Sequence, residues 1–499
     1  MPRAINWTAL SVFVFFFVLV TVLGFAASRW QQGEKKKAHL DEWGLGGRNF
    51  GAWITWFLVG GDFYTAYTVI AVPALVYAVG AYGFFALPYT ILVYPIVFII
   101  MPRLWDAAHK AGHVTAADVV YGRYGSRALE LAVAVTAVVA TMPYIALQLV
   151  GMEVVIKALG LTGELPLAAA FVILALYTYS AGLRAPALIA FVKDVMIYIV
   201  VLVAVVLVPA KLGGYSAVFA SAGAAFAAKG GATGLTLQPQ QLLPYASLAL
   251  GSALAAFMYP HTLTGIFAAR SADTIRRNAV FLPAYTVLLG LIALLGYMAY
   301  AARLDIRSNN EVVPALFNAL FPASFAGFAF AAIAIGALVP AAVMSIGAAN
   351  IFTRNFWKAY VQPDVTPAGE AKVAKIVSLV VKLGALAFIL YLPTQFALDL
   401  QLLGGICILQ TFPAVVFGLF FNWFRAPALF LGWAAGLAGG TTLAFMDGVK
   451  PVHTFAIGGE HYTIYTGLLA LALNIATAVV VQFLRNMLMT RAPRAGVGS

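Results

Sequence analysis

The chain has 499 residues, of which 63% are hydrophobic and only 10% are charged. Soluble domains carry about 25% charged residues, so this composition excludes an ordinary water-facing surface and predicts a surface that mostly contacts lipid. Lys and Arg outnumber Asp and Glu by 30 to 18. In a membrane protein such an excess collects in cytoplasmic loops, so it does not indicate nucleic-acid binding. The single cysteine, Cys407, allows no disulfide framework and no thiolate metal site.

Apolar segments long enough to cross a bilayer, about 20 residues each, recur along the whole chain. They cover residues 7–27, 50–76, 82–104, 127–157, 163–181, 185–208, 242–268, 278–301, 324–352, 373–393, 397–421, 427–446 and 462–484. We therefore predict an all-α, polytopic membrane protein of about 13 transmembrane helices. Basic residues follow the first segment where a signal peptide would have a cleavage site, so we expect this helix to be retained.

The distribution of positive charge predicts an orientation. Most of the Lys and Arg residues fall in alternate loops, beginning with the loop after the first segment. Positively charged loops stay on the cytoplasmic side. We therefore expect a bacterial-type inner (plasma) membrane protein with its N-terminus outside and its C-terminus in the cytoplasm.

The order of the segments predicts an internal repeat. The Gly- and Ala-rich stretch 209–241, a predicted extracytoplasmic loop, separates two groups of five helices at 50–208 and 242–421. Because five is odd, the second group must be inverted relative to the first, as in many secondary transporters. A leading helix and basic loop precede the groups at 1–49, and two peripheral helices with a cytoplasmic tail follow at 422–499.

The first helix of each group is interrupted near its middle. Residues 60–65 read GGDFYT and residues 259–262 read YPHT. Unwound backbone at membrane depth is tolerated only where protein or a cavity satisfies it, and breaks in matching places indicate a substrate site. Ordinary helix kinks are the alternative. The predicted substrate-binding residues are Gly61, Phe63, Tyr64, Thr65, Gln148, Tyr259, His261 and Thr262.

Ionisable side chains inside the spans are further candidates. An unpaired carboxylate is costly to bury, so Asp62 is expected to bind a coupling cation, face a positive partner or carry a proton, unless it makes a structural hydrogen bond. Asp194 is a second candidate for the cation pathway. Lys193 is a candidate counter-charge for an anionic substrate, and a buried ion pair is the alternative for both. Because adjacent residues point different ways on a helix, the two need not neutralise each other, and we expect each to have a partner on another helix. His261 either binds a substrate carboxylate or is a core histidine.

Several short motifs, in this order and spacing, resemble those of the sodium:solute symporter family. They are GGRNF at 46–50, YAVG at 77–80, AGLRA at 181–185 and IFTR at 351–354. The likeness runs from about residue 7 to 485 and implies a LeuT-type core of ten helices arranged as a 5+5 inverted repeat. The two interrupted stretches are similar to those of acetate and monocarboxylate permeases in this family. This likeness implies uptake of a short carboxylate such as lactate, pyruvate or acetate.

One part of the sequence departs from the family pattern. The resemblance implies a sodium ion bound between the first break and hydroxyl residues of the eighth core helix. Counting back from the IFTR motif places Val339 and Pro340 where those hydroxyls are expected, and Ser345 lies more than a turn away. Hard cations need oxygen ligands, so both sodium and a proton stay open as the coupling ion. The candidate residues are Asp62, Asp194 and Ser345, with a sodium ion expected near Gly61, Tyr64 and Asp194.

We interpret the chain as a secondary active symporter for a small monocarboxylate, with no cofactor beyond Na⁺ or H⁺. Its expected partners are the carboxylate and the lipid bilayer, without nucleic acid. No phosphate-binding loop of the GxxxxGK type is present, so ATP is not implied, and no acid–base cluster indicates an enzyme. A sodium-independent or proton-coupled carrier of the same fold is one alternative. A channel-like facilitator is another, although no repeated filter sequence is evident.

Overall fold

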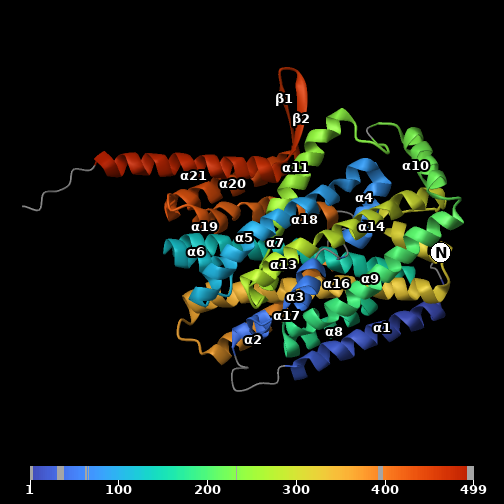
Figure 1. Ribbon diagram of the computed structural model, residues 1–499, viewed down its shortest axis with the longest axis horizontal. Coiled ribbons are helices and arrows are strands. Elements are labelled where there is room, and N and C mark those ends of the chain that lie inside the picture. Colours follow the sequence, from blue (N-terminus) through green and yellow to red (C-terminus); the bar gives the residue numbers. More distant parts are fainter. Residues whose placement is uncertain are drawn as a thin grey trace, which may run out of the picture.

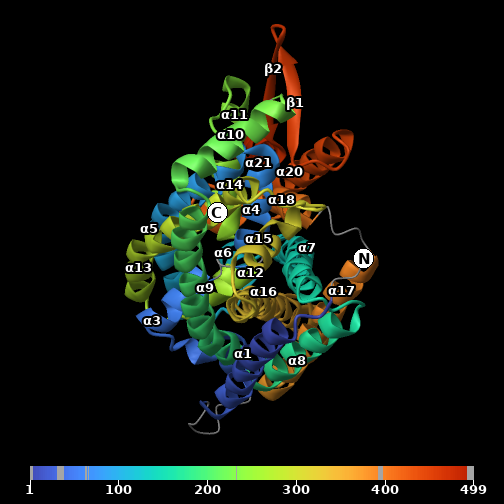
Figure 2. The same ribbon diagram turned by 90° about the vertical axis from the view of Figure 1, so that its right-hand side faces the viewer.

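The computed structural model of the protein describes residues 4–30, 39–61, 65, 67–231, 233–391 and 397–491. These residues form a bundle of helices from which one β-hairpin projects (Figure 1). Helices α1 and α8 lie along one edge of the bundle, and α20 and α21 lie along the opposite edge (Figure 1). Figure 2 shows α16 inside the bundle, where it packs against α1, α7, α9, α12 and α17.

The α-helices cover most of the described chain. Their bounds are α1 (Trp7–Ala26), α2 (Leu40–Leu45), α3 (Ala52–Thr55), α4 (Val72–Val79), α5 (Ala86–Ala111), α6 (Ala116–Tyr124), α7 (Arg127–Ala158), α8 (Leu165–Ala181), α9 (Arg184–Lys211), α10 (Tyr215–Lys229), α11 (Pro239–Ala256), α12 (Pro260–Ala268), α13 (Ala272–Phe281), α14 (Pro283–Ala301), α15 (Val312–Leu320), α16 (Ala323–Ile351), α17 (Pro367–Tyr391), α18 (Ala397–Leu409), α19 (Gly418–Phe420), α20 (Ala426–Met446) and α21 (Thr466–Arg491). Wider, π-helical turns form at Trp56–Gly60, Tyr67–Ala71, Phe352–Val361 and Pro413–Phe417. Strands β1 (Val452–Ile457) and β2 (Glu460–Tyr465) pair antiparallel, with Val452 opposite Tyr465.

Within the described residues, each predicted apolar segment falls mainly on one or more helices, although residues 462–465 belong to β2. Among the described residues, 8 helices are long and apolar enough to cross a membrane, or 10 if each of two bent pairs is one span. The predicted spans 50–76 and 163–181 fall on shorter apolar helices, and 373–393 extends past α17 out of the described residues. The multi-span helical architecture is therefore as predicted, although fewer spans than 13 meet this length criterion.

The two interrupted helices run antiparallel and are joined at both ends. At one end, Phe50 N–H donates to Ala268 O and Arg270 N–H donates to Phe50 O, both at 3.0 Å. At the other end, Ala81 N–H donates to Gly234 O at 2.7 Å. The start of the first helix thus meets the end of the second, and the end of the first meets the segment before the second. Inverted repeats require this relation, while the division at 50–208 and 242–421 stays a prediction.

The second break lies slightly earlier in the chain than predicted. Helix α11 ends at Ala256, α12 begins at Pro260, and the two meet at 49°. Proline suits the first helical turn because its missing N–H has no helical partner there in any case. His261 and Thr262 therefore belong to a regular helix and not to unwound backbone, which corrects the prediction. At the first break, residues 62–64 lie outside the described residues.

Two connecting segments contain more regular structure than predicted. The stretch 209–241, expected to be a loop, contains α10, whose residues Val218, Ala222 and Phe226 are buried at the four-residue spacing of a helix face. The β-hairpin is an exception to the all-α prediction. Its turn consists of the glycines 458–459, both with positive φ, and two-residue hairpin turns favour such residues.

Small residues set the spacing of α16 and its neighbours. A Cβ atom on Gly327 would lie 2.2 Å from the backbone oxygen of Ala9 in α1. Close approach of this kind is how helices associate in lipid, where no water drives them together.

Gly327→Ala is therefore expected to destabilise the protein by about 1–3 kcal/mol, because the added methyl group meets backbone that cannot move aside. Gly290→Ala is the matched control: its Cβ would lie 3.1 Å from the end of the Leu87 side chain, and alanine is about 0.5–1 kcal/mol more favourable than glycine in a helix. The free energy of unfolding of both variants in detergent checks this. Equal stability of the two variants would contradict the tight α1–α16 contact.

Candidate functional site

A small cavity lies beside the second break, and we call it the His261 cavity. It is lined by Val59, Tyr89, Tyr144, Ser252, Ala255, Ala256, Tyr259, His261, Thr262, Gln401, Leu402, Gly405 and Tyr465. The space open to water is about 30 Å³, and one water needs about 10–15 Å³ on this measure. The chamber therefore holds a few waters or a molecule of only a few heavy atoms.

Three aromatic rings form one wall of the His261 cavity. The ring of Tyr144 in α7 lies 5.4 Å from that of Tyr259 and 5.2 Å from that of His261, and the last two are 5.4 Å apart. The Tyr259 hydroxyl donates to Gln401 O at 3.3 Å. Apolar walls with a few convergent polar groups are typical of small-molecule sites.

The structure brings some of the predicted substrate-binding residues together and not others. Tyr259, His261 and Thr262 line the His261 cavity. Gln148 does not line it, although it is buried one turn away in α7, where its Nε2 donates to Tyr144 O at 3.3 Å. Thr65 forms a local turn: its N–H donates to Thr68 Oγ1 at 3.0 Å. Phe63 and Tyr64 lie outside the described residues, as does Asp62.

Sequence reasoning missed several lining residues. Tyr465, at the end of β2, donates its hydroxyl to Leu402 O at 2.8 Å and its N–H to Ser247 Oγ at 3.0 Å. No sequence pattern connects Tyr465 with a break some two hundred residues earlier. Gln401 and Ser252 had a usable signal, because each is a polar residue within an apolar segment. Tyr89 had none beyond its position inside a span.

A second cluster connects α9 to the first break. Lys193 and Asp194 are both fully buried, with 0% exposure. Lys193 Nζ donates to Gly61 O at 2.5 Å and lies 3.0 Å from Asp194 Oδ1. Asp194 Oδ2 accepts from the Tyr285 hydroxyl at 2.8 Å. The expected partners on other elements are therefore present, and the two neighbours also pair with each other, as in the alternative of a buried ion pair.

The absence of a side chain at Gly61 lets Lys193 and Asp194 pack directly against its backbone. A Cβ at this position would lie 2.9 Å from Asp194 Oδ2 and 3.0 Å from Lys193 Nζ, so a larger residue would push the ion pair away. The ammonium gives the Gly61 carbonyl a charge-assisted hydrogen bond at membrane depth. Lys193 does not line the His261 cavity, and its role as a counter-charge for the substrate stays a prediction.

Ser345, the third predicted ion-site residue, faces a different helix. Its hydroxyl donates to Ala342 O at 2.8 Å and accepts from Ser378 Oγ of α17 at 3.4 Å. Ser378 Oγ in turn accepts from the buried Lys382 ammonium at 2.6 Å. Among the hydrogen bonds of the described residues, Ser345 has none with Gly61 or Asp194.

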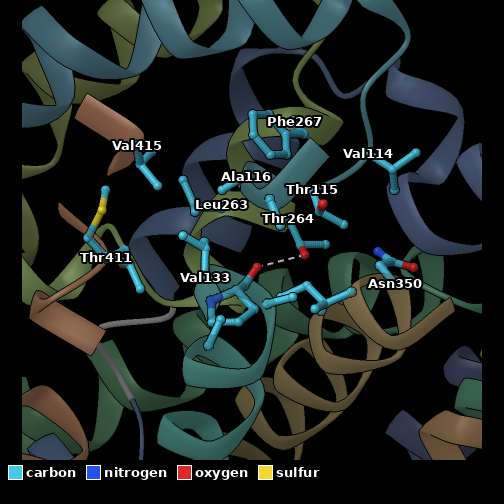
Figure 3. A pocket seen from close by; sticks show the side chains of 17 residues that line it. Val114, Thr115, Ala116, Val133, Leu263, Thr264, Phe267, Asn350, Thr411 and Val415 are labelled. Atoms are coloured by element: carbon cyan, nitrogen blue, oxygen red, sulfur yellow. Dashed lines mark hydrogen bonds between the residues drawn. The ribbon is translucent and has the colours of Figure 1, made fainter. Parts of the chain in front are cut away.

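A second small cavity, which we call the Thr264 cavity, also borders α12 and is shown in Figure 3. Its lining comes from α6, α7, α12 and α16 and the segment after α18, and includes Thr115, Val133, Pro260, Leu263, Thr264, Asn350 and Thr411. The Thr264 hydroxyl donates to Pro260 O at 2.7 Å, as the dashed line in Figure 3 marks. Residues 258 and 260 line this cavity, whereas residues 259, 261 and 262 line the His261 cavity, so both cavities border this turn.

Comparison with known proteins gives consistent matches along the chain. The model of the sodium:solute symporter family matches residues 43–436, in agreement with the resemblance drawn from the motifs. A monocarboxylate transport permease protein of Rhizobium johnstonii is 74% identical over 484 residues, which cover 97% of this chain and 98% of that protein. The uncharacterized symporter YodF of Bacillus subtilis is 32% identical, over 96% of this chain and 95% of its own.

A solved structure also matches. It is a substrate-bound, outward-open state of a Na⁺-coupled sialic acid symporter, with a TM-score of 0.78 over 96% of this chain and 97% of that chain. At 14% identity the likeness concerns the fold alone. Together with the family match, it confirms the predicted fold class, a polytopic helical protein with a LeuT-type core.

Tyr285→Phe is expected to lower the free energy of unfolding by about 1.5–3 kcal/mol, because it removes a hydrogen bond to a buried carboxylate. Tyr297→Phe, in the same helix, is the matched control, since the described structure gives the Tyr297 hydroxyl no hydrogen-bond partner although its ring is buried. Chemical denaturation of both variants in detergent measures the difference. A Tyr285→Phe protein as stable as Tyr297→Phe would mean that Asp194 does not depend on this hydroxyl.

Proposed function

Because this chain belongs to the sodium:solute symporter family, we propose that it carries a small monocarboxylate across the membrane by secondary active transport. Members of this family are transporters and not enzymes. The observation that carries the substrate proposal is the His261 cavity, a chamber of about 30 Å³ with an imidazole and hydroxyl groups in an aromatic wall. The 74% identical relative is named a monocarboxylate transport permease, which supports the same substrate class.

The carboxylate is proposed to lie at the first turn of α12. The N-terminus of a helix presents unpaired N–H groups and a partial positive charge, both of which favour an anion. His261 and Thr262 are in this turn and line the cavity. The remaining few heavy atoms of the substrate would contact Tyr144 and Tyr259. Lactate, pyruvate and acetate suit a chamber of this size, whereas a sugar or a sialic acid would need it to expand.

Transport is proposed to work by alternating access. The His261 and Thr264 cavities both border residues 258–262, so a movement of this turn would transfer the substrate from one to the other. The hydrogen bonds of Phe50 with Ala268 and Arg270 connect the two interrupted helices, which would make them move together. A channel would instead need a continuous pore.

Accumulation against a gradient requires a driving ion. The inward movement of one positive charge releases about 2.3 kcal/mol per 100 mV, enough for roughly 50-fold accumulation. We propose that uptake is coupled to a cation and is driven by the membrane potential. The coupling cation is sodium by family membership, or a proton, the alternative that the sequence leaves open.

The orientation that the charge distribution predicts, with the N-terminus outside and the C-terminus inside, leads to a labelling experiment. In a background with Cys407 replaced by serine, Ala456→Cys in the exposed hairpin should react with an impermeant maleimide added to intact cells. Asp364→Cys, also exposed, should react only after the cells are opened. The reverse pattern would invert the proposed topology.

Proteoliposomes that contain the protein and unlabelled lactate should take up labelled lactate by counterflow. His261→Ala is expected to raise the KM for lactate about 10- to 100-fold, because a hydrogen bond to a charged group contributes about 1.5–3 kcal/mol. His109→Ala is the control: this exposed histidine stacks on Trp105 at 4.4 Å and lies outside both cavities.

Two results would contradict the proposal. Absence of counterflow with lactate, pyruvate and acetate alike would exclude small monocarboxylates as the substrate class. Counterflow with an unchanged KM in a folded His261→Ala protein would remove His261 from the carboxylate site. Uptake that does not saturate with lactate concentration would favour the channel.

A further inference from the structure

The expected sodium position lies at the first break, near Gly61 and Asp194, and the structure allows its chemistry to be tested. A sodium ion there would need oxygen ligands from the Gly61 carbonyl, from a carboxylate and from hydroxyls on α16. Hard cations in proteins are surrounded by several such oxygens. The contacts of each group determine whether it is available to a metal ion.

An ammonium group already contacts the oxygens that the ion would use. Lys193 Nζ is 2.5 Å from Gly61 O and 3.0 Å from Asp194 Oδ1. The other carboxylate oxygen of Asp194 accepts from Tyr285 at 2.8 Å. A metal ion bound to the same oxygens would lie within a few ångströms of a fixed positive charge in a buried site, where repulsion is weakly screened.

Among the described residues, two charged side chains also lie close against Gly61. A single carbon atom added to Gly61 would lie 2.9 Å from Asp194 Oδ2 and 3.0 Å from Lys193 Nζ. Both side chains are fully buried and packed against the helix. An ion could enter only if the lysine side chain moved away from its carboxylate and its carbonyl.

The part of α16 that is expected to face the sodium position has no hydroxyl side chains. Counting back from the IFTR motif places Val339 and Pro340 where the family pattern is expected to have them, and neither side chain has an oxygen. The nearest hydroxyl along the helix, Ser345, bonds to Ala342 and Ser378. Among the described residues, this position therefore does not fit a sodium ion while the Lys193 ammonium occupies it, because of both its charge and its proximity.

We infer that Lys193 is a built-in cation that takes the place of sodium at the first break, so that this chain binds no sodium in its core and transports without it. The inference rests on the proposed carrier function for its meaning in transport, and it selects the sodium-independent alternative. A sodium ion that a family member would bind from solution is here replaced by a side chain of the protein itself. The Lys193 ammonium contacts both the Gly61 carbonyl and the Asp194 carboxylate.

The test is the thermal unfolding of the purified full-length protein, without substrate, in sodium chloride and in choline chloride at equal ionic strength. An ion that binds the folded state lowers the unfolding equilibrium constant about 100-fold at 100 times its dissociation constant. The wild-type protein is expected to show the same Tm in both salts. A sodium-specific rise in its Tm would overturn the inference.

Lys193→Ala provides the complementary measurement. Removing the ammonium leaves the Gly61 carbonyl and the Asp194 carboxylate without that cation, so this variant should gain a sodium-specific rise in Tm. Lys382→Ala is the matched control, because it removes another buried ammonium whose partner is Ser378, and it should gain none. A folded Lys193→Ala protein that does not respond to sodium would overturn the replacement of sodium by lysine.

The wild-type comparison is decisive even if Lys193→Ala does not fold. Because no substrate is present, a sodium effect would overturn this inference and leave the monocarboxylate proposal intact. Failure of lactate counterflow would do the opposite.

Discussion

A carbonyl or amide group that leaves a helix inside a bilayer must find a partner within the protein, because lipid offers none. This constraint shapes both interrupted helices. At the first break the Gly61 carbonyl accepts from the Lys193 ammonium. At the end of α12, Ala269 O accepts from Trp105 Nε1 at 2.9 Å, and Arg270 N–H donates to Phe50 O. The partners come from α9, α5 and the residue Phe50 before α3, so satisfying the backbone also fixes how these elements pack.

The sequence was sufficient for the features that depend on local chemistry. Apolar segments of spanning length predicted the helices because a bilayer has a fixed thickness. Pro260 correctly indicated an interruption, and the neighbouring Tyr259 and His261 do line a cavity. The error at this break has a local cause, since proline disrupts the helix before it and equally well begins the helix after it. The residues after Pro260 are therefore helical.

Features that depend on long-range packing could not be predicted. Tyr465 reaches the cavity through a hairpin that no apolar pattern marks. Lys193 and Asp194 begin on different sides of α9, as adjacent helical residues do, which suggested separate partners. The four-carbon lysine side chain is long enough to turn back to its neighbour. In that position its ammonium also donates a hydrogen bond to the Gly61 carbonyl. Only the placement of the first break against α9 decides between these outcomes.

The ion pair also bears on where a substrate anion would find its positive charge. Lys193 and Asp194 together are neutral, and both are directed at Gly61 and Tyr285 rather than into the His261 cavity. The first break therefore offers the substrate little net charge through this pair. A carboxylate in the chamber would depend on the N-terminal turn of α12 and on His261, which are weaker attractors than a full cation. Weak attraction suits a carrier, because a substrate held too tightly at the centre of the membrane would not be released on the other side.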